Sequence, residues 1–128
     1  MYNLFISHAW KYSEHYDKVV EWLDESDIEY KNYSVPKADP LHVNKKDELK
    51  KDLTNQIKPT SCVIILAGMY AAHSEWIDYE IDEAVRMGKY IIALKPWGQE
   101  KTPKKVQDNC DELVGWNSSS LIAAIEDM

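Results

Sequence analysis

The chain has 128 residues, 45% of them hydrophobic, which indicates one folded domain over residues 1–128 rather than a disordered segment. With 22 acids against 15 bases the formal net charge is −7, which excludes broad binding to nucleic acid or to an anionic membrane. The two cysteines and four histidines have no metal-ligand or redox spacing, so we expect no metal site. Because the sequence has no signal peptide and no apolar run of membrane-span length, we expect a cytoplasmic protein.

The first half of the chain predicts two strands, two helices and a long loop. A short apolar run at residues 3–7 is typical of a buried strand, and Ser13 then begins a helix. The alternation of residues 28–33 predicts a strand near the edge of a sheet. Residues 34–43 hold two prolines and little apolar content, so we expect a loop there, followed by a helix that starts near Asn44.

The second half predicts two buried strands and then smaller elements. Residues 62–68 are continuously apolar and rich in β-branched side chains, which is typical of a strand covered on both faces. Residues 90–94 repeat this pattern. We expect a loop or a short helix at 101–109, a weak strand at 112–116, and a terminal helix capped by the serine at 118 or 119.

The helix between the two buried strands carries the candidate catalytic acid. Ser74 is a suitable N-cap and Gly88 is suited to the left-handed residue that ends a helix. At about 100° per residue, one apolar arc contains Ile77, Ile81, Ala84 and Val85. Glu80 lies at the edge of this arc beside Trp76, four residues earlier. A carboxylate held there without partners costs several kcal/mol, on the order of other buried charges, so Glu80 is either an acid that reaches water or a site residue at the mouth of a cleft.

The order of the elements predicts where a ligand binds. Strands and helices alternate, which implies a parallel sheet with helices on both faces and right-handed crossovers. In such folds ligands bind beyond the carboxyl ends of the strands. We expect residues 7–10, 34–43, 68–74 and 95–98 to meet there.

Several common chemistries are excluded by the residues at this edge. The chain has four glycines and no glycine-rich phosphate loop, and Ala67 and Gly68 occupy the place where a phospho-receiver needs an aspartate. Ser7 and His8 are neighbours on a strand end and point to opposite faces, so they form a poor nucleophile and base pair. No second carboxylate is placed for glycosidase-type acid and base catalysis.

One carboxylate beside an aromatic side chain remains, and this combination favours cleavage of an N-glycosidic bond to ribose. The transition state is an electron-poor oxocarbenium ion, which a single carboxylate can stabilise while an indole stacks on the departing base. Electrostatic groups of this kind contribute on the order of 10²–10³ in rate in other enzymes.

Several motifs resemble those of TIR (Toll/interleukin-1 receptor) domains. The sequence Leu-Phe-Ile-Ser-His at residues 4–8, followed by a polar and aromatic turn, resembles the first TIR strand. Ser74-x-Trp76-x-x-x-Glu80 resembles the segment that carries the catalytic glutamate of TIR domains that cleave NAD. Further blocks extend the likeness to the small prokaryotic TIR-like family, which includes the TIR subunit of the Thoeris antiphage system. These blocks lie at residues 32–36, 66–70, 95–99 and 114–117.

The resemblance implies a single TIR-like α/β domain, flavodoxin-like, with a five-stranded parallel sheet in the order 2-1-3-4-5. It implies loss of nicotinamide from NAD, with the ADP-ribose part released or cyclised as a signal, so NAD is a substrate and no cofactor is required. Glu80 is then the catalytic residue. The resemblance implies that the substrate is bound by Ser7, His8, Trp10, Tyr33 and Trp76. Because many TIR enzymes act only when assembled, the expected partners are further copies of the chain or a protein activator.

Two other functions remain open at this point. A non-catalytic TIR-like interaction module would tolerate Glu80→Gln, whereas changes near Asp39 and Leu41 would abolish its partner binding. A deoxyribosyltransferase-like enzyme would exchange bases between nucleosides and leave NAD intact.

Overall fold

The computed structural model describes residues 1–7, 13–34, 46–95 and 101–128. Within these residues, five strands form one parallel sheet in the order β2-β1-β3-β4-β5, as predicted. The strands are β1 (Tyr2–Ile6), β2 (Tyr30–Asn32), β3 (Cys62–Leu66), β4 (Tyr90–Leu94) and β5 (Glu112–Val114). The helices are α1 (Ser13–Glu25), α2 (Lys46–Ile57), α3 (Tyr70–Arg86), α4 (Lys104–Asn109) and α5 (Ser118–Glu126), with a 3₁₀ turn η3 (Ala67–Met69) before α3.

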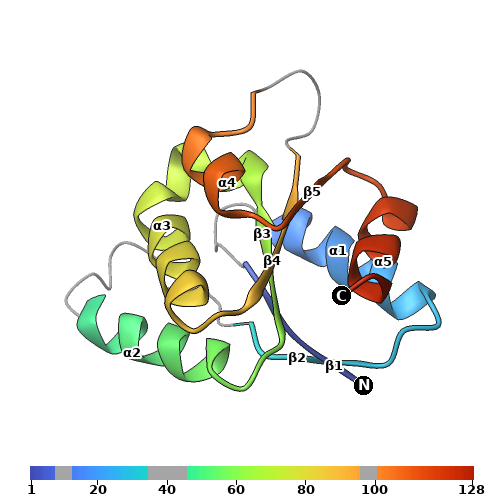
Figure 1. Ribbon diagram of the computed structural model, residues 1–128, viewed down its shortest axis with the longest axis horizontal. Helices are drawn as coiled ribbons and strands as arrows, with labels where there is room; N and C mark the ends of the chain where they lie inside the picture. Colours follow the sequence, from blue (N-terminus) through green and yellow to red (C-terminus); the bar gives the residue numbers. More distant parts are fainter. Residues whose placement is uncertain (8–12, 35–45, 96–100) are drawn as a thin grey trace.

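The helices cover both faces of the sheet, so the molecule has three layers (Figure 1). Helices α2, α3 and α4 lie on one face, and α1 and α5 lie together on the other. The positions of α1 to α4 follow from right-handed crossovers, because the chain moves along the sheet in opposite directions before and after β2. The flavodoxin-like α/β fold predicted from the sequence is confirmed.

The core lies on both faces of the central strands. All five residues of β3 are buried, and the carboxyl halves of β1 and β4 are buried as well. Strands covered on both faces need apolar side chains at every position, which explains the continuous apolar runs in the sequence. Strand β2 lies at the edge of the sheet, as predicted, and is short and largely exposed.

Helix α3 begins earlier than the sequence indicates. We expected Ser74 to cap it, but the helix starts at Tyr70 directly after η3, and Ser74 lies inside it. Ala71 and Ala72 are strong helix formers, so the chain enters the helix without a separate loop. Residues 68–74, expected to be a connecting segment, are therefore part of η3 and the first turns of α3.

The other end of α3 is the one predicted. Gly88 has a φ of 68°, the left-handed conformation that most side chains avoid. The N–H of Gly88 donates to the carbonyl of Val85 at 3.1 Å, and the N–H of Lys89 donates to the carbonyl of Ala84 at 2.8 Å. These two bonds form a Schellman motif, which satisfies carbonyls that the helix itself leaves open.

The packed face of α3 is turned toward Glu80. Val85, expected on the apolar arc, is 51% exposed, whereas Glu80 at the opposite edge of the arc is fully buried. The residues between them, Ile77, Ile81 and Ala84, are buried as expected. The centre of the packed face therefore lies closer to Glu80 than the apolar pattern alone indicates.

The remaining elements follow the sequence with small differences. The segment at 101–109 contains a short helix, α4, which is one of the two expected alternatives. Asn117, not a serine, caps α5, because its side chain accepts a bond from the N–H of Ser120 at 2.9 Å. Trp22 and Trp116 pack against each other, with ring centroids 4.9 Å apart. Among the helices described, none combines the length and hydrophobicity that a membrane span requires.

Candidate active site

Two of the predicted substrate-binding residues lie at the carboxyl ends of neighbouring strands. Ser7 follows β1, and its N–H donates to the carbonyl of Ile64 on β3 at 2.9 Å. Tyr33 follows β2, and its N–H donates to the carbonyl of Leu4 on β1 at 2.8 Å. Both residues thus continue the ladders of their strands, and their side chains continue the alternation of faces along them.

Hydrogen bonds from β2 identify the face of the sheet that α1 covers. The hydroxyl of Tyr30 donates to Asp24 of α1 at 2.6 Å. The amide of Asn32 donates to the hydroxyl of Tyr16, also on α1, at 2.7 Å. The side chains at these two alternate positions of β2 therefore face α1.

Ser7 and Tyr33 face the opposite layer. Leu4 is in register with Asn32 and shares its face, so Ser7, three residues further along β1, points to the other face. Tyr33 follows Asn32 directly and also points there. This is the face covered by α2, α3 and α4.

Glu80 lies in the same layer, on helix α3. It lies on the arc of α3 that packs on the sheet, and its side chain has no exposed surface. Trp76, one turn earlier, is half-buried and packs against the core. We expected an acid at the mouth of a cleft. The structure instead has a fully covered carboxylate in the layer that Ser7 and Tyr33 face.

The side chain of Ser7 is an exception among the buried polar groups. In the described part of the chain the buried polar side chains are Ser7, Thr60 and Glu80. The hydroxyl of Thr60 donates to the carbonyl of Ile57 at 2.7 Å. The Oγ of Ser7 is buried and has no hydrogen-bond partner. An orphaned buried hydroxyl costs about 1–3 kcal/mol, so its presence needs an explanation.

The other predicted site residues lie outside the part that the structure describes. These are His8 and Trp10, together with most of the expected site segments at 34–43 and 95–98. Of the six predicted site residues, the structure therefore locates Ser7, Tyr33, Trp76 and Glu80.

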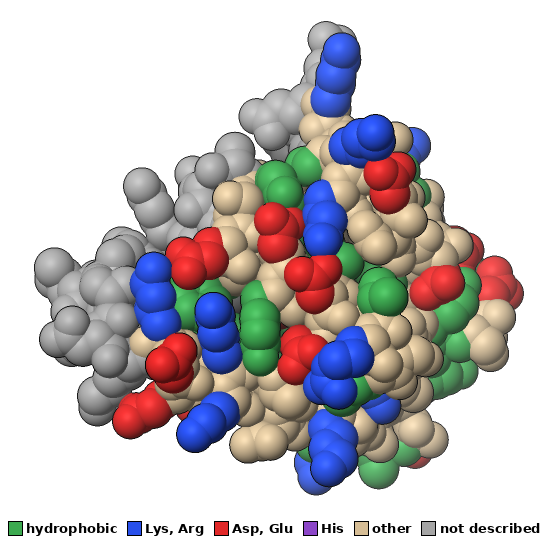
Figure 2. Space-filling model, turned by 60° about the vertical axis from the view of Figure 1, so that its left-hand side comes forward, with side chains coloured by type: hydrophobic (Ala, Val, Ile, Leu, Met, Phe, Trp, Pro, Cys, Tyr) green, Lys and Arg blue, Asp and Glu red, His purple; other side chains and the backbone are tan. Residues whose placement is uncertain are grey.

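In the described part of the chain, three of the polar contacts that attach α3 to the helices on either side of it are made by acidic side chains of α3. Two are surface ion pairs, from Lys46 of α2 to Glu75 at 3.3 Å and from Lys105 of α4 to Asp82 at 2.6 Å. Figure 2 shows acidic and basic side chains interleaved on this face of the molecule. The third contact is the bond from Thr54 of α2 to Glu83.

Glu83 is the centre of a larger network that the sequence analysis missed. Arg86 donates to both of its carboxylate oxygens, at 2.6 and 3.1 Å, and Tyr79 also contacts it. The bond from Arg86 lowers the pKa of Glu83 against the opposing effect of burial, and Thr54 and Tyr79 lower it further. Two spacings on one helix were the local signs of this network in the sequence: Tyr79 and Glu83 are four residues apart, and Glu83 and Arg86 are three apart.

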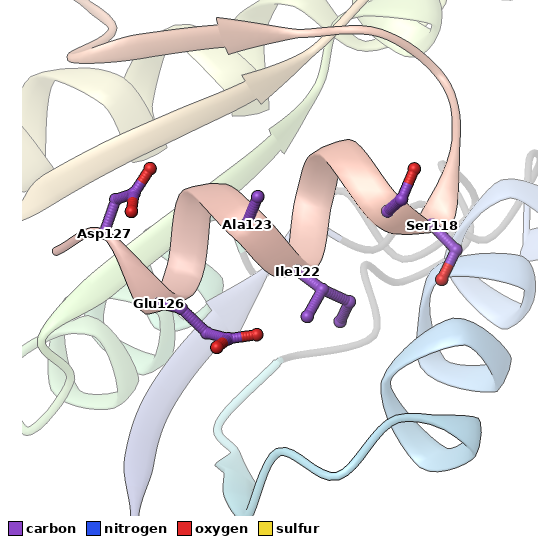
Figure 3. Close-up of a pocket in the computed structure, with 6 residues that line it drawn as sticks. Ser118, Ile122, Ala123, Glu126 and Asp127 are labelled. Atoms are coloured by element: carbon purple, nitrogen blue, oxygen red, sulfur yellow. The ribbon is translucent and has the colours of Figure 1, made fainter.

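A surface hollow on α5 is poorly suited to binding a nucleotide. Its lining residues all come from α5 or the residue after it, and they include Glu126 and Asp127 but no basic side chain (Figure 3). Two carboxylates beside a phosphate repel it, so this hollow is a poor site for an anionic ligand. Within the described residues no group of three or more metal-binding side chains comes together.

Comparisons with known proteins identify a family and a solved structure of similar fold. Residues 5–101 match the family model for the Thoeris protein ThsB, TIR-like domain. A solved structure of Clostridium botulinum CMP N-glycosidase, BcmB, is similar with a TM-score of 0.58 and 16% sequence identity, covering 97% of this chain and 98% of that chain. At this identity the likeness shows the fold alone. No curated protein matches the sequence.

Proposed function

The chain belongs to the family of TIR-like domains of the Thoeris protein ThsB, and on that premise we propose that it is an enzyme that cleaves the nicotinamide–ribose bond of NAD. The observation that carries the proposal is the position of Glu80, a buried carboxylate on the sheet-facing side of α3. Ser7 and Tyr33, at the carboxyl ends of β1 and β2, face the same layer. In open α/β sheets, ligands bind at this edge.

The proposed reaction needs only one carboxylate. The bond between C1′ of the ribose and the pyridinium nitrogen breaks, and its electron pair leaves with neutral nicotinamide. The positive charge moves to C1′ and the ring oxygen, where the carboxylate of Glu80 stabilises it. Water then adds to C1′ and loses a proton to give ADP-ribose, or a hydroxyl or base nitrogen of the same molecule adds to give a cyclic product.

The fold relative supports the reaction class more than the substrate. Its name denotes an N-glycosidase of CMP, so a chain of this fold cleaves the N-glycosidic bond of a nucleotide. For the present chain, the Thoeris family and the Ser74-x-Trp76-x-x-x-Glu80 motif favour NAD over CMP. A signal made from ADP-ribose fits a role in antiphage defence.

The complete coverage of Glu80 has a consequence for activity. A nucleotide reaches a carboxylate with no exposed surface only after neighbouring groups move apart. We therefore propose that the single chain is a resting form and that self-association or a protein activator opens the site. Activity is then expected to rise steeply with protein concentration or on addition of an extract from phage-infected cells.

The same coverage favours a second candidate function, a non-catalytic TIR-like interaction module. A carboxylate that no substrate reaches has no catalytic role, and the fold then serves as a binding scaffold. This candidate predicts that the wild-type chain leaves NAD intact in every oligomeric state, and that Glu80→Gln retains partner binding.

Chromatography of NAD and CMP after incubation with the wild-type chain separates the two candidates. The enzyme proposal predicts nicotinamide release from NAD, at concentrations where the chain assembles or with infected-cell extract, and little cytosine release from CMP. Cytosine release alone would move the substrate to CMP and overturn the choice of NAD. No release of either base under any of these conditions would favour the interaction module.

A further inference from the structure

The orphaned hydroxyl of Ser7 marks a group that the protein alone leaves unsatisfied. Ser7 is fully buried, its Oγ has no hydrogen-bond partner in the described part of the chain, and its N–H is already used in the β1–β3 ladder. Its neighbours on the same face of the sheet include Phe5, two residues earlier on β1, and Ile65 on the adjacent strand β3, with Ala93 beyond it on β4. All three are apolar and buried, so they offer the hydroxyl no partner.

The side chains in this layer limit what group satisfies Ser7. Glu80 enters the layer from α3, and a carboxylate disfavours a phosphate or another anion nearby. An ionised carboxylate only accepts hydrogen bonds, whereas a serine hydroxyl both donates and accepts. A neutral group with two adjacent hydroxyls matches this pair, because one hydroxyl donates to Glu80 while the other exchanges a bond with Ser7. The ribose of a nucleotide carries such a pair at its 2′ and 3′ carbons.

We infer that Ser7 is a specificity-determining residue that binds one hydroxyl of the substrate ribose while Glu80 binds the other. The inference rests on the proposed function for the identity of the sugar as that of a nucleotide. The inference goes beyond the proposed function because it names Ser7 as the group that distinguishes ribose from deoxyribose. A buried polar group that waits for a substrate hydroxyl rejects an analogue without it, since the group is then left unpaired.

Ser7→Ala tests this role, with Ser61→Ala as the matched control. Ser61 is an exposed serine just before the amino end of β3, the neighbouring strand, so its removal touches neither the layer nor its ligand. In the absence of nucleotide, Ser7→Ala is expected to melt at the same temperature as the wild type or higher, because it removes a hydroxyl that has no partner. A lower melting temperature for Ser7→Ala than for Ser61→Ala would show a structural role and overturn the inference.

The second measurement is the binding of nicotinamide mononucleotide, CMP and their 2′-deoxy and 3′-deoxy forms, by calorimetry or ligand-induced thermal shift. It is made at protein concentrations at which the chain assembles, where the proposed function expects the site to be open. The wild type and Ser61→Ala are expected to bind the ribose form of at least one of these probes about tenfold more tightly than each deoxy form. Ser7→Ala is expected to lose the preference at one of the two positions and to keep it at the other. Equal preferences in Ser7→Ala and the wild type would overturn the inference, and so would a wild type that binds no ribose form or does not distinguish it from the deoxy forms.

The binding data separate this inference from the proposed function. A wild type that binds the ribose form through Ser7 but releases no nicotinamide from NAD removes the proposed reaction and leaves the role of Ser7 in place. If instead the wild type releases nicotinamide and Ser7→Ala keeps both ribose preferences, the proposed reaction stands and the role of Ser7 is overturned.

Discussion

Thr54 of α2 donates a hydrogen bond of 2.6 Å to Glu83 of α3, although the two residues belong to different strand-to-strand connections. The hydroxyl of Tyr79 lies 2.6 Å from that of Thr54, and Arg86 bonds both oxygens of Glu83. Glu83 follows Glu80 by three residues on the same helix. The network that fixes α3 against α2 therefore also helps to fix the direction in which Glu80 faces.

Glu83→Gln is expected to destabilise the fold. It replaces charge-assisted bonds from Arg86 and Thr54 with weaker neutral ones, so we expect the free energy of unfolding to fall by about 1–3 kcal/mol in urea at pH 7. Glu21→Gln is the matched control, because Glu21 pairs with Lys18 at 3.4 Å on the surface of α1 and both side chains are about half-exposed. That change is expected to cost less than about 0.5 kcal/mol. Equal losses in the two variants would contradict the network's role.

The same variant has a pH signature. The bond from Arg86 lowers the pKa of Glu83 in the folded chain below its value in the unfolded chain. The stability contributed by the carboxylate is therefore fully present above the unfolded pKa and is lost as the pH falls through the folded pKa. The difference between wild type and Glu83→Gln is expected to shrink below about pH 4. A difference that stays constant between pH 7 and pH 3 would contradict this assignment.

Gly88→Ala isolates the effect of backbone conformation. A Cβ added at Gly88 meets no heavy atom within 4 Å, so the substitution brings no clash. The φ of 68° nevertheless disfavours alanine, and we expect a loss of about 1–2 kcal/mol in the free energy of unfolding. Gly88→Asn is expected to lose less, because asparagine tolerates the left-handed region better. A Gly88→Ala chain as stable as the wild type would contradict the Schellman ending of α3.

The two free cysteines are expected to differ in reactivity. Burial raises the pKa of the Cys62 thiol to about 12, and the side chain is enclosed in the core. Burial also raises the pKa of Cys110, but that residue is only partly buried. With iodoacetamide at pH 8, peptide mapping is expected to find Cys110 modified in the folded protein and Cys62 modified only after unfolding. Modification of both at one rate without denaturant would contradict the position of Cys62 in the core.

The sequence was sufficient to predict the sheet, but it predicted the candidate site only in part. Strands β3 and β4 were predictable because continuous apolar runs are needed where both faces are covered. The end of α3 was predictable because Gly88 acts locally. The expectation that Ser7 and His8 point to opposite faces stays a prediction, because His8 lies outside the described residues.

The rest depended on tertiary contacts. The apolar pattern did not show that the packed face of α3 turns toward Glu80 and exposes Val85, because this depends on where α2 and α4 stand beside it. The bond between Thr54 and Glu83 joins residues 29 positions apart, and no local pattern reveals such a pair. The full burial of Glu80 follows from the same packing.

The most direct test of the account is the rate of nicotinamide release from NAD by wild type, Glu80→Gln and Glu75→Gln under activating conditions. Glu75 lies on the same helix, is more than half-exposed and pairs with Lys46, so it serves as a matched control. The account predicts that Glu80→Gln lowers the rate at least 10²-fold, on the order of the loss of one electrostatic group, while Glu75→Gln stays close to the wild type. A folded Glu80→Gln chain that releases nicotinamide at the wild-type rate would contradict the catalytic role of Glu80.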